Sequence, residues 1–189
     1  MKPVISIVVP IYGVERYIEQ CARSLFAQSY DALQFVFVND GTKDRSMEIL
    51  NGLIESEYSH LKDRIVIVDK KNGGLPAARR TGLEHVTGDY VYNVDPDDWI
   101  SEGSMEKIAS VAESTDADII YFHYVKEYEN RSSVKKEGSY TGADKALYVR
   151  NMYNHRAYGT LCNKCIKTSL FRDHQIFVPS YGHAEDCCI

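Results

Sequence analysis

Short apolar runs alternate with amphipathic stretches along the first 125 residues. The apolar runs are brief and rich in Val, Ile and Phe, which is typical of strands buried on both faces. Between them, apolar residues recur every three or four positions, which predicts helices with one face against a sheet. The predicted strands span residues 4–9, 35–38, 65–68, 90–94 and 119–125, and the predicted helices span 14–26, 47–54, 75–86 and 105–112. The alternation predicts an α/β fold of three layers, with a mainly parallel sheet between helices.

The last third of the chain gives a weaker pattern. Residues 126–140 turn polar and charged, which indicates a surface excursion, whereas residues 143–152 favour a helix and residues 161–166 a short strand. We expect one domain over residues 1–189, because this length suits a single core. The sequence stops without a Gly, Pro or charged tail, so we expect a chain truncated within its last part.

Composition excludes several classes of protein. Of the 189 residues, 44% are hydrophobic and 26% charged, with a net charge of -5, so the chain is an ordinary globular protein and we expect no nucleic-acid partner. Its apolar runs fall short of the roughly 20 residues that span a bilayer, and Met1 is not followed by the core of a signal peptide. We therefore expect a cytoplasmic protein. The five cysteines, an odd number, are expected to be reduced thiols.

Polar residues follow four of the predicted strands directly. Tyr12 comes after the first strand, Asp40 after the second, residues 70–80 after the third and residues 95–98 after the fourth. The carboxyl ends of parallel strands share one edge of a sheet, which is where such folds bind ligands. The sequence therefore predicts that these four segments form one pocket.

Three carboxylates, those of Asp95, Asp97 and Asp98, fall within four positions. Their mutual repulsion would be relieved by a cation, and Mg²⁺ or Mn²⁺ prefers a few carboxylate oxygens together with phosphate oxygens. The alternative is a turn followed by aspartates that cap the next helix.

A glycine pair at 73–74 precedes Arg79 and Arg80. Glycines let the main chain approach a ligand closely, and an arginine fork can hold a phosphate or the edge of a base. The alternative is a turn with both arginines in solvent. Asp40 likewise has a structural alternative, an Asx turn before Gly41.

These residues belong to a series of motifs in a fixed order. The motifs are PIYG (10–13), SLFAQSY (24–30), VNDGTKD (38–44), GGLPAARRTG (73–82), GDY (88–90), DPDDW (95–99) and ED (185–186). In order and spacing they resemble the family 2 glycosyltransferases over essentially the whole chain. The resemblance implies a GT-A fold and the transfer of a sugar from a nucleotide diphosphate, with UDP as the expected nucleotide, and inversion at the anomeric carbon.

Carried over to this sequence, the resemblance assigns roles to individual residues. The nucleotide site would contain Pro10, Tyr12, Asp40, Arg79 and Asp95, with Asp40 accepting a hydrogen bond from the base. Asp97, together with Asp95, would bind the Mg²⁺ or Mn²⁺ that bridges the two phosphates. Asp186, or in second place Glu185, would be the catalytic base that deprotonates the acceptor hydroxyl. These roles suffice chemically, since an inverting displacement needs a base on one face and an electrophile on the leaving diphosphate.

The resemblance also divides the chain into a nucleotide-binding part over about residues 1–125 and the start of an acceptor part over about residues 126–189. It implies synthesis of bacterial cell-surface polysaccharide. The acceptor would be a saccharide or a lipid-linked saccharide at the inner face of the membrane, contacted peripherally through segments beyond residue 189. Asn39 stands where the family usually has Asp, and Gly13 and Arg80 where it usually has Asn. These departures leave the preferred base open, and the motifs do not encode the transferred sugar.

Three other interpretations of the sequence stay open. Zinc could be bound by a set with suitable types and spacing, namely Cys162, Cys165, His183 and Cys187. A non-catalytic module that binds nucleotide sugars would share the pocket. A sugar-1-phosphate nucleotidyltransferase would share the sheet, but it would need a Gly-rich, Arg-containing loop after the first strand, which residues 10–13 do not provide.

Overall fold

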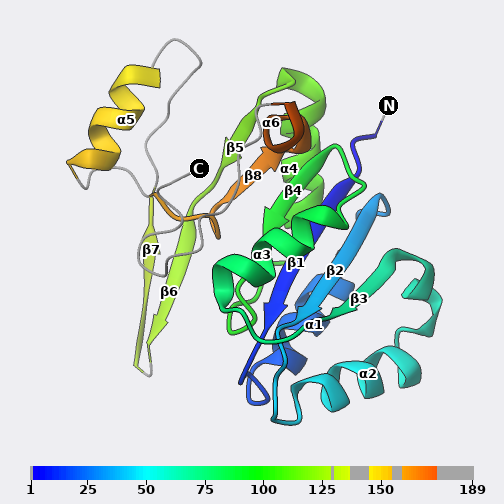
Figure 1. Ribbon diagram of the computed structural model, residues 1–189. Helices are drawn as coiled ribbons and strands as arrows, with labels where there is room; N and C mark the ends of the chain where they lie inside the picture. Colours follow the sequence, from blue (N-terminus) through cyan, green and yellow to red (C-terminus); the bar gives the residue numbers. More distant parts are fainter. Residues whose placement is uncertain (1, 129, 137–144, 155–158, 174–189) are drawn as a thin grey trace.

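The computed structural model describes residues 2–128, 130–136, 145–154 and 159–173 (Figure 1). The elements in these ranges are β1 (Ile5–Ile11), α1 (Ile18–Phe26), β2 (Leu33–Asn39), α2 (Ser46–Ser56), η1 (Ser59–Arg64), β3 (Ile65–Asp69), α3 (Leu75–Glu84), β4 (Tyr90–Asn93), α4 (Ser104–Thr115), β5 (Ile119–Tyr121), β6 (Tyr124–Tyr128), β7 (Arg131–Lys135), α5 (Lys145–Tyr153), β8 (Lys164–Lys167) and α6 (Thr168–Asp173).

Six strands form the main sheet in the order β3-β2-β1-β4-β8-β5. Strand β1 pairs in parallel with β2 and β4, and β2 pairs in parallel with β3. Strand β8 runs antiparallel to both of its neighbours, β4 and β5. The predicted α/β fold with a mainly parallel sheet is therefore confirmed, while the insertion of β8 between β4 and β5 was not predicted.

Helices cover both faces of the sheet, so β1 is buried along its whole length. Alternate residues of a strand point to opposite faces. Accordingly, Ile7 and Val9 belong to a core shared with α1, α2 and α4, whereas Val8 belongs to a second core that includes Ala78 of α3 and Phe171 of α6. This two-sided burial explains why the first strand reads as a continuous apolar run.

Two residues of the sequence motifs, Gly82 and Asp89, build the sheet rather than the pocket. A Cβ atom at Gly82 would lie 2.3 Å from Cγ1 of Val8, so glycine at this position lets α3 pack closely on β1. Asp89 ties the start of β4 to Val4: its Oδ2 accepts from the Val4 amide at 2.8 Å, and its own amide donates to the Val4 carbonyl at 2.8 Å.

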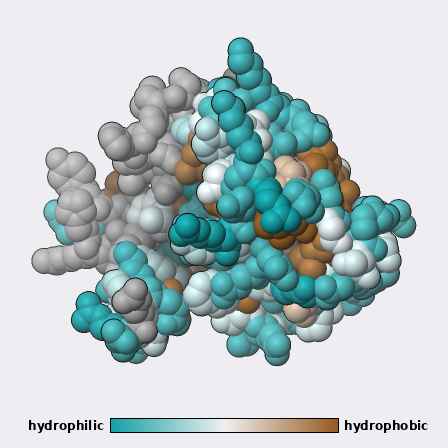
Figure 2. All heavy atoms as spheres, turned by 90° about the horizontal axis from the view of Figure 1, so that it is seen from below, coloured by the Kyte–Doolittle hydropathy of each residue, from teal (hydrophilic) through white to brown (hydrophobic). Residues whose placement is uncertain are grey.

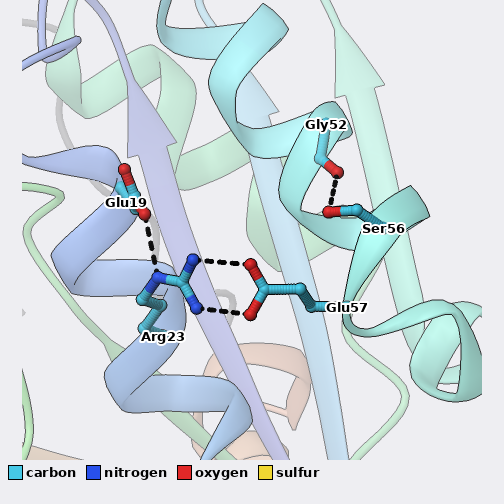
Figure 3. A network of polar contacts seen from close by, with 5 residues as sticks. All are labelled: Glu19, Arg23, Gly52, Ser56 and Glu57. Atoms are coloured by element: carbon cyan, nitrogen blue, oxygen red, sulfur yellow. Dashed lines mark hydrogen bonds and ion pairs between the residues drawn. The ribbon is translucent and has the colours of Figure 1, made fainter.

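An ion pair links α1 to the end of α2 (Figure 3). The two terminal nitrogens of Arg23 donate to the two carboxylate oxygens of Glu57, each at 2.7 Å, and Arg23 Nε donates to Glu19 at 2.9 Å. In the last turn of α2, Ser56 Oγ donates to the carbonyl of Gly52 at 2.7 Å. Because the side chains of this pair are exposed to water, it contributes little to the stability of the fold.

The second half of the sheet differs from the prediction. Residues 119–125 do not form one strand: β5 ends at Tyr121 in the main sheet, and β6 begins at Tyr124 in a separate antiparallel hairpin with β7. Figure 1 shows this hairpin at the left, beside the main sheet. The predicted polar excursion is therefore partly a hairpin, and its residues are mostly exposed, as the polar composition indicated.

The predicted helix at 143–152 corresponds to α5, and the predicted strand at 161–166 corresponds to β8, which begins later. The short elements η1 and α6 were not predicted. Within the described ranges, every helix is too short or too polar to cross a bilayer.

Candidate functional site

A pocket of about 600 Å³ lies at the carboxyl ends of the parallel strands. The loops after β1, β2, β3 and β4 all contribute to its lining, which includes Pro10, Tyr12, Asp40, Gly74, Asp95 and Asp97. Figure 2 looks onto this end of the molecule, where hydrophobic residues lie among a mostly hydrophilic surface. The prediction that four separate loops form one pocket is therefore confirmed.

Asp40 joins two of these loops. The residue is 2% exposed, and its Oδ1 accepts from Lys70 Nζ at 2.5 Å and from the amide of Gly73 at 2.9 Å. Its Oδ2 accepts from the amide of Gly74 at 2.8 Å. The buried carboxylate thus fixes the glycine loop after β3 to the end of β2, so the role of Asp40 in shaping the pocket is at least partly structural.

Asn39, rather than Asp40, forms the local side-chain turn. Its Oδ1 accepts from the amide of Thr42 at 2.9 Å, and its Nδ2 donates to Asp69 Oδ1 at 2.8 Å. The alternative of an Asx turn at Asp40 is therefore wrong. An ionised aspartate at position 39 would lack the donor for Asp69 and would repel it, so the amide suits this position. The main chain at Gly41, with φ of 69°, passes close to the loop after β3, because a Cβ at Gly41 would lie 3.0 Å from the amide nitrogen of Asn72.

Arg79 lies behind Asp95. It is 2% exposed, and its Nη2 donates to Asp95 Oδ1 at 2.8 Å. Among the described residues the lining of the pocket includes Asp95 but not Arg79, so the guanidinium can act on the pocket through Asp95. The alternative with both arginines in solvent is wrong for Arg79 and correct for Arg80, which is exposed.

The three aspartates after β4 do not all face the same way. Asp95 and Asp97 line the pocket, while carboxylate oxygens of Asp95 and Asp98 lie within 4.8 Å of each other and of Cys162 Sγ. Desolvation raises the pKa of Asp98 to about 6, and the negative charges of Asp95 and Asp97 add to the shift. The converging atoms of Asp95, Asp98 and Cys162 fit a divalent cation, whereas Asp97, which the sequence predicted as a ligand together with Asp95, lines the pocket but is not part of this group.

The competing explanation, that these aspartates cap the next helix, is wrong. Helix α4 begins only at Ser104, and its N-cap position is Gly103. Asp98 does take part in a turn, because its amide donates to the carbonyl of Asp95 at 3.0 Å. The turn half of that alternative is therefore correct, and it is compatible with a cation site.

Sequence reasoning missed the position of Cys162. It considered this residue only as a zinc ligand with Cys165, but Cys165 is fully buried in the core and burial raises the pKa of its thiol. A protonated thiol in a core is a poor metal ligand. No sequence pattern indicates that Cys162 lies near Asp95, because their proximity comes from the unpredicted insertion of β8 beside β4. His183 and Cys187, the other two residues of the zinc hypothesis, lie outside the described residues.

The predicted catalytic residues, Asp186 and Glu185, also lie outside the described residues, so their assignment stays a prediction. The other predicted residues of the nucleotide and metal sites are either in the lining of the pocket or, for Arg79, bonded to a residue that is.

The open, mainly parallel sheet with a pocket at the carboxyl ends of its strands defines the class of the protein, an α/β ligand-binding fold. Within this class the chain belongs to glycosyl transferase family 2, whose family model matches residues 6–175.

Individual relatives agree with this family. The chain is 28% identical over 190 residues to the putative glycosyltransferase EpsH of Bacillus subtilis, which covers 97% of this chain and 54% of EpsH. The fold is similar to that of S. aureus TarS 1-349 in complex with UDP, with a TM-score of 0.77 and 23% identity over 97% of this chain and 53% of TarS 1-349. It is also similar to the mannosyltransferase PcManGT from Pyrobaculum calidifontis in complex with GDP-Man and Mn2+, with a TM-score of 0.67 and 16% identity over 99% of this chain and 50% of PcManGT. The fold is therefore GT-A, and the chain spans about half the length of each of these relatives.

Proposed function

We propose that the protein is an inverting, metal-dependent glycosyltransferase that takes a sugar from a nucleotide diphosphate, UDP in the first place. The observation that carries this proposal is that Asp40, Asp95 and Asp97 line one pocket, although Asp40 follows β2 and the other two follow β4. Family membership supports sugar transfer as the reaction, and the UDP complex of TarS supports a nucleotide donor.

One side of the pocket suits a nucleoside. Pro10, Leu75 and Ala78 offer apolar contacts, and Tyr12, at 55% exposed, presents an aromatic side chain at the rim. Asp40 accepts three hydrogen bonds within the protein, while an ionised carboxylate has about four lone-pair positions. One position thus remains for an N–H group of the base, which is the role that the family resemblance assigns to Asp40.

The acidic side suits a cation and a diphosphate. Asp95 and Asp97 provide carboxylate oxygens in the lining, and the ion pair with Arg79 orients Asp95. A divalent cation bound there would neutralise negative charge on the leaving diphosphate. The Mn2+ complex of PcManGT supports a divalent cation in this fold without fixing which metal this chain uses.

We assign proton abstraction from the acceptor hydroxyl to Asp186, with Glu185 as the second choice. The acceptor would be a saccharide or lipid-linked saccharide of a bacterial cell-surface polysaccharide, reached at the inner face of the membrane. The chain covers 54% of EpsH, so the acceptor, the linkage and the location are proposed for the whole protein.

Thermal unfolding with UDP tests the donor and metal assignments together. UDP at about 100 times its dissociation constant should stabilise the protein by about 2.7 kcal/mol. We expect a clearly larger shift of Tm with Mn²⁺ or Mg²⁺ than with EDTA. Asp97→Asn should lose the metal-dependent part and keep the rest, while the exposed Asp63→Asn serves as the matched control. Equal shifts with metal and with EDTA in the wild type would contradict the metal assignment.

Release of the sugar from a UDP-sugar distinguishes an enzyme from a non-catalytic module that binds nucleotide sugars. A non-catalytic module would bind UDP in the same metal-dependent way without cleaving the donor. Slow metal-dependent hydrolysis of UDP-sugar, lost in Asp97→Asn, is the expected result.

A further inference from the structure

The loop between β4 and α4 carries the three aspartates of the pocket, and we call residues 95–103 the acidic loop. This loop ends at a helix that lacks a cap of its own. The N-cap position of α4 is Gly103, with φ of 67° and no side chain to accept a hydrogen bond. The first N–H groups of a helix have no partners within the helix, so a cap must come from elsewhere.

Gln28, which follows α1, supplies this cap. Its Oε1 accepts from the amide of Met105 at 3.2 Å, while its Nε2 donates to the carbonyl of Ser101 at 3.1 Å and to that of Ser24 at 3.0 Å. One side-chain amide therefore caps α4, holds the end of the acidic loop and is itself anchored to α1.

Ser24 holds the middle of the loop. Its Oγ accepts from the amide of Ile100 at 3.1 Å and donates to the carbonyl of Cys21 at 2.7 Å. Cys21 is fully buried, and its Sγ lies 3.9 Å from the carbonyl oxygen of Asp95, at the start of the loop. Cys21 and Ser24 of α1, together with Gln28 just after it, thus contact the acidic loop at its beginning, middle and end.

We propose that Ser24 and Gln28 are positioning residues, which hold the acidic loop so that Asp95 and Asp97 face the pocket in the arrangement that binds the metal and the diphosphate. Like-charged carboxylates repel one another, and a loop without anchors would let them move apart into water. Fixing them before the ligand binds reduces the entropy that binding must overcome. This inference rests on the proposed function, but the placement of the loop can be measured without any ligand.

Trp99 is a built-in reporter of this placement. It is the single tryptophan of the chain, it lies within the acidic loop beside Ile100, and it is 47% exposed. Because its emission comes from this loop, its acrylamide quenching reports the exposure of the loop, and a change in its anisotropy at constant protein size reports a change in local motion.

The experiment compares Gln28→Ala and Ser24→Ala with the wild type. Gln20→Ala is the matched control, because Gln20 is an exposed residue of α1. In Gln28→Ala we expect lower anisotropy and stronger quenching of Trp99 without ligand. The affinity for UDP in EDTA should stay within about twofold of the wild type, while the gain in affinity on adding Mn²⁺ should shrink by about tenfold, the worth of one hydrogen bond. Ser24→Ala should change both readouts in the same direction and less.

Unchanged Trp99 anisotropy and quenching in both variants would overturn the proposal. A lower Tm with an unchanged gain from Mn²⁺ would also overturn it, because that is the effect of a cap with a purely structural role. If Gln28→Ala does not fold, Ser24→Ala decides alone, since it leaves the cap of α4 intact. If the wild type itself gains no UDP affinity from Mn²⁺, the proposed function is wrong, whereas the Trp99 comparison still decides whether α1 holds the loop.

Discussion

The carboxylate of Asp40 is the most consequential single group to alter in the pocket, and Asp40→Asn changes it with almost no change in shape. The asparagine oxygen can still accept from Lys70 and from the amide of Gly73. Its NH₂ group must then face the amide of Gly74, which now donates to Oδ2 at 2.8 Å. The substitution therefore removes a buried ion pair and sets two donors against each other.

The structure gives the magnitude of this change. A hydrogen bond to a charged group contributes about 1.5–3 kcal/mol, and a buried N–H group left without an acceptor costs about 1–3 kcal/mol. The side chain of Asp40 is 3% exposed and that of Lys70 is 20% exposed, so the lysine can turn partly to water. We therefore expect Asp40→Asn to lower the free energy of unfolding by about 3 kcal/mol, the lower end of the range for breaking a buried pair.

Urea denaturation followed by far-ultraviolet circular dichroism measures this loss. The matched control is Asp31→Asn. Asp31 forms an ion pair with Lys2 at 2.9 Å, but the side chains of Asp31 and Lys2 are 62% and 63% exposed. Water and salt screen such a pair, so its removal should have little effect. A double-mutant cycle with Lys70→Met isolates the pair itself. If Asp40→Asn costs no more than Asp31→Asn, or if the cycle shows no coupling, the assignment of Asp40 as a structural link is refuted.

Three further predictions concern other parts of the chain. Burial alone would raise the pKa of Asp44, but hydrogen bonds, chiefly from Ser46, lower it from 3.8 to about 2. The ionised form therefore stabilises the fold above pH 3.8, and we expect about 1–2 kcal/mol to be lost as the pH falls from 4 to 2. Urea titrations at both pH values should show a smaller loss in Asp44→Asn. Gly82→Ala should lower the free energy of unfolding by about 1–3 kcal/mol through the clash with Val8, and an unchanged Tm would contradict the close packing. In a full-length form, Asp186→Asn should keep UDP-sugar affinity and lose turnover by about 10² to 10⁴, whereas Glu185→Gln should lose less; a reversed ranking would move the base to Glu185.

The sequence by itself determined the architecture of the first 94 residues and the location of the pocket. Strands buried on both faces must be apolar throughout, so the runs that became β1 to β4 were visible directly. The parallel order then forces the residues after these strands to one edge, so Tyr12, Asp40 and Asp95 could be grouped without any structure. The spacing of apolar residues within each segment is enough for this prediction, because strands and helices each repeat with a characteristic period.

Only the tertiary structure decided what each polar residue contacts. Asp40 reads as a ligand-binding residue or a local turn, yet its carboxylate accepts from Lys70 and the glycine loop, 30 to 34 positions away. The cap of α4 comes from Gln28, 77 positions before Met105. Cys162 reaches Asp95 because an antiparallel strand inserts beside β4. These contacts join residues that are far apart in the sequence and belong to different elements. The packing of whole elements therefore determines them, because the periodicity within one element does not extend to another.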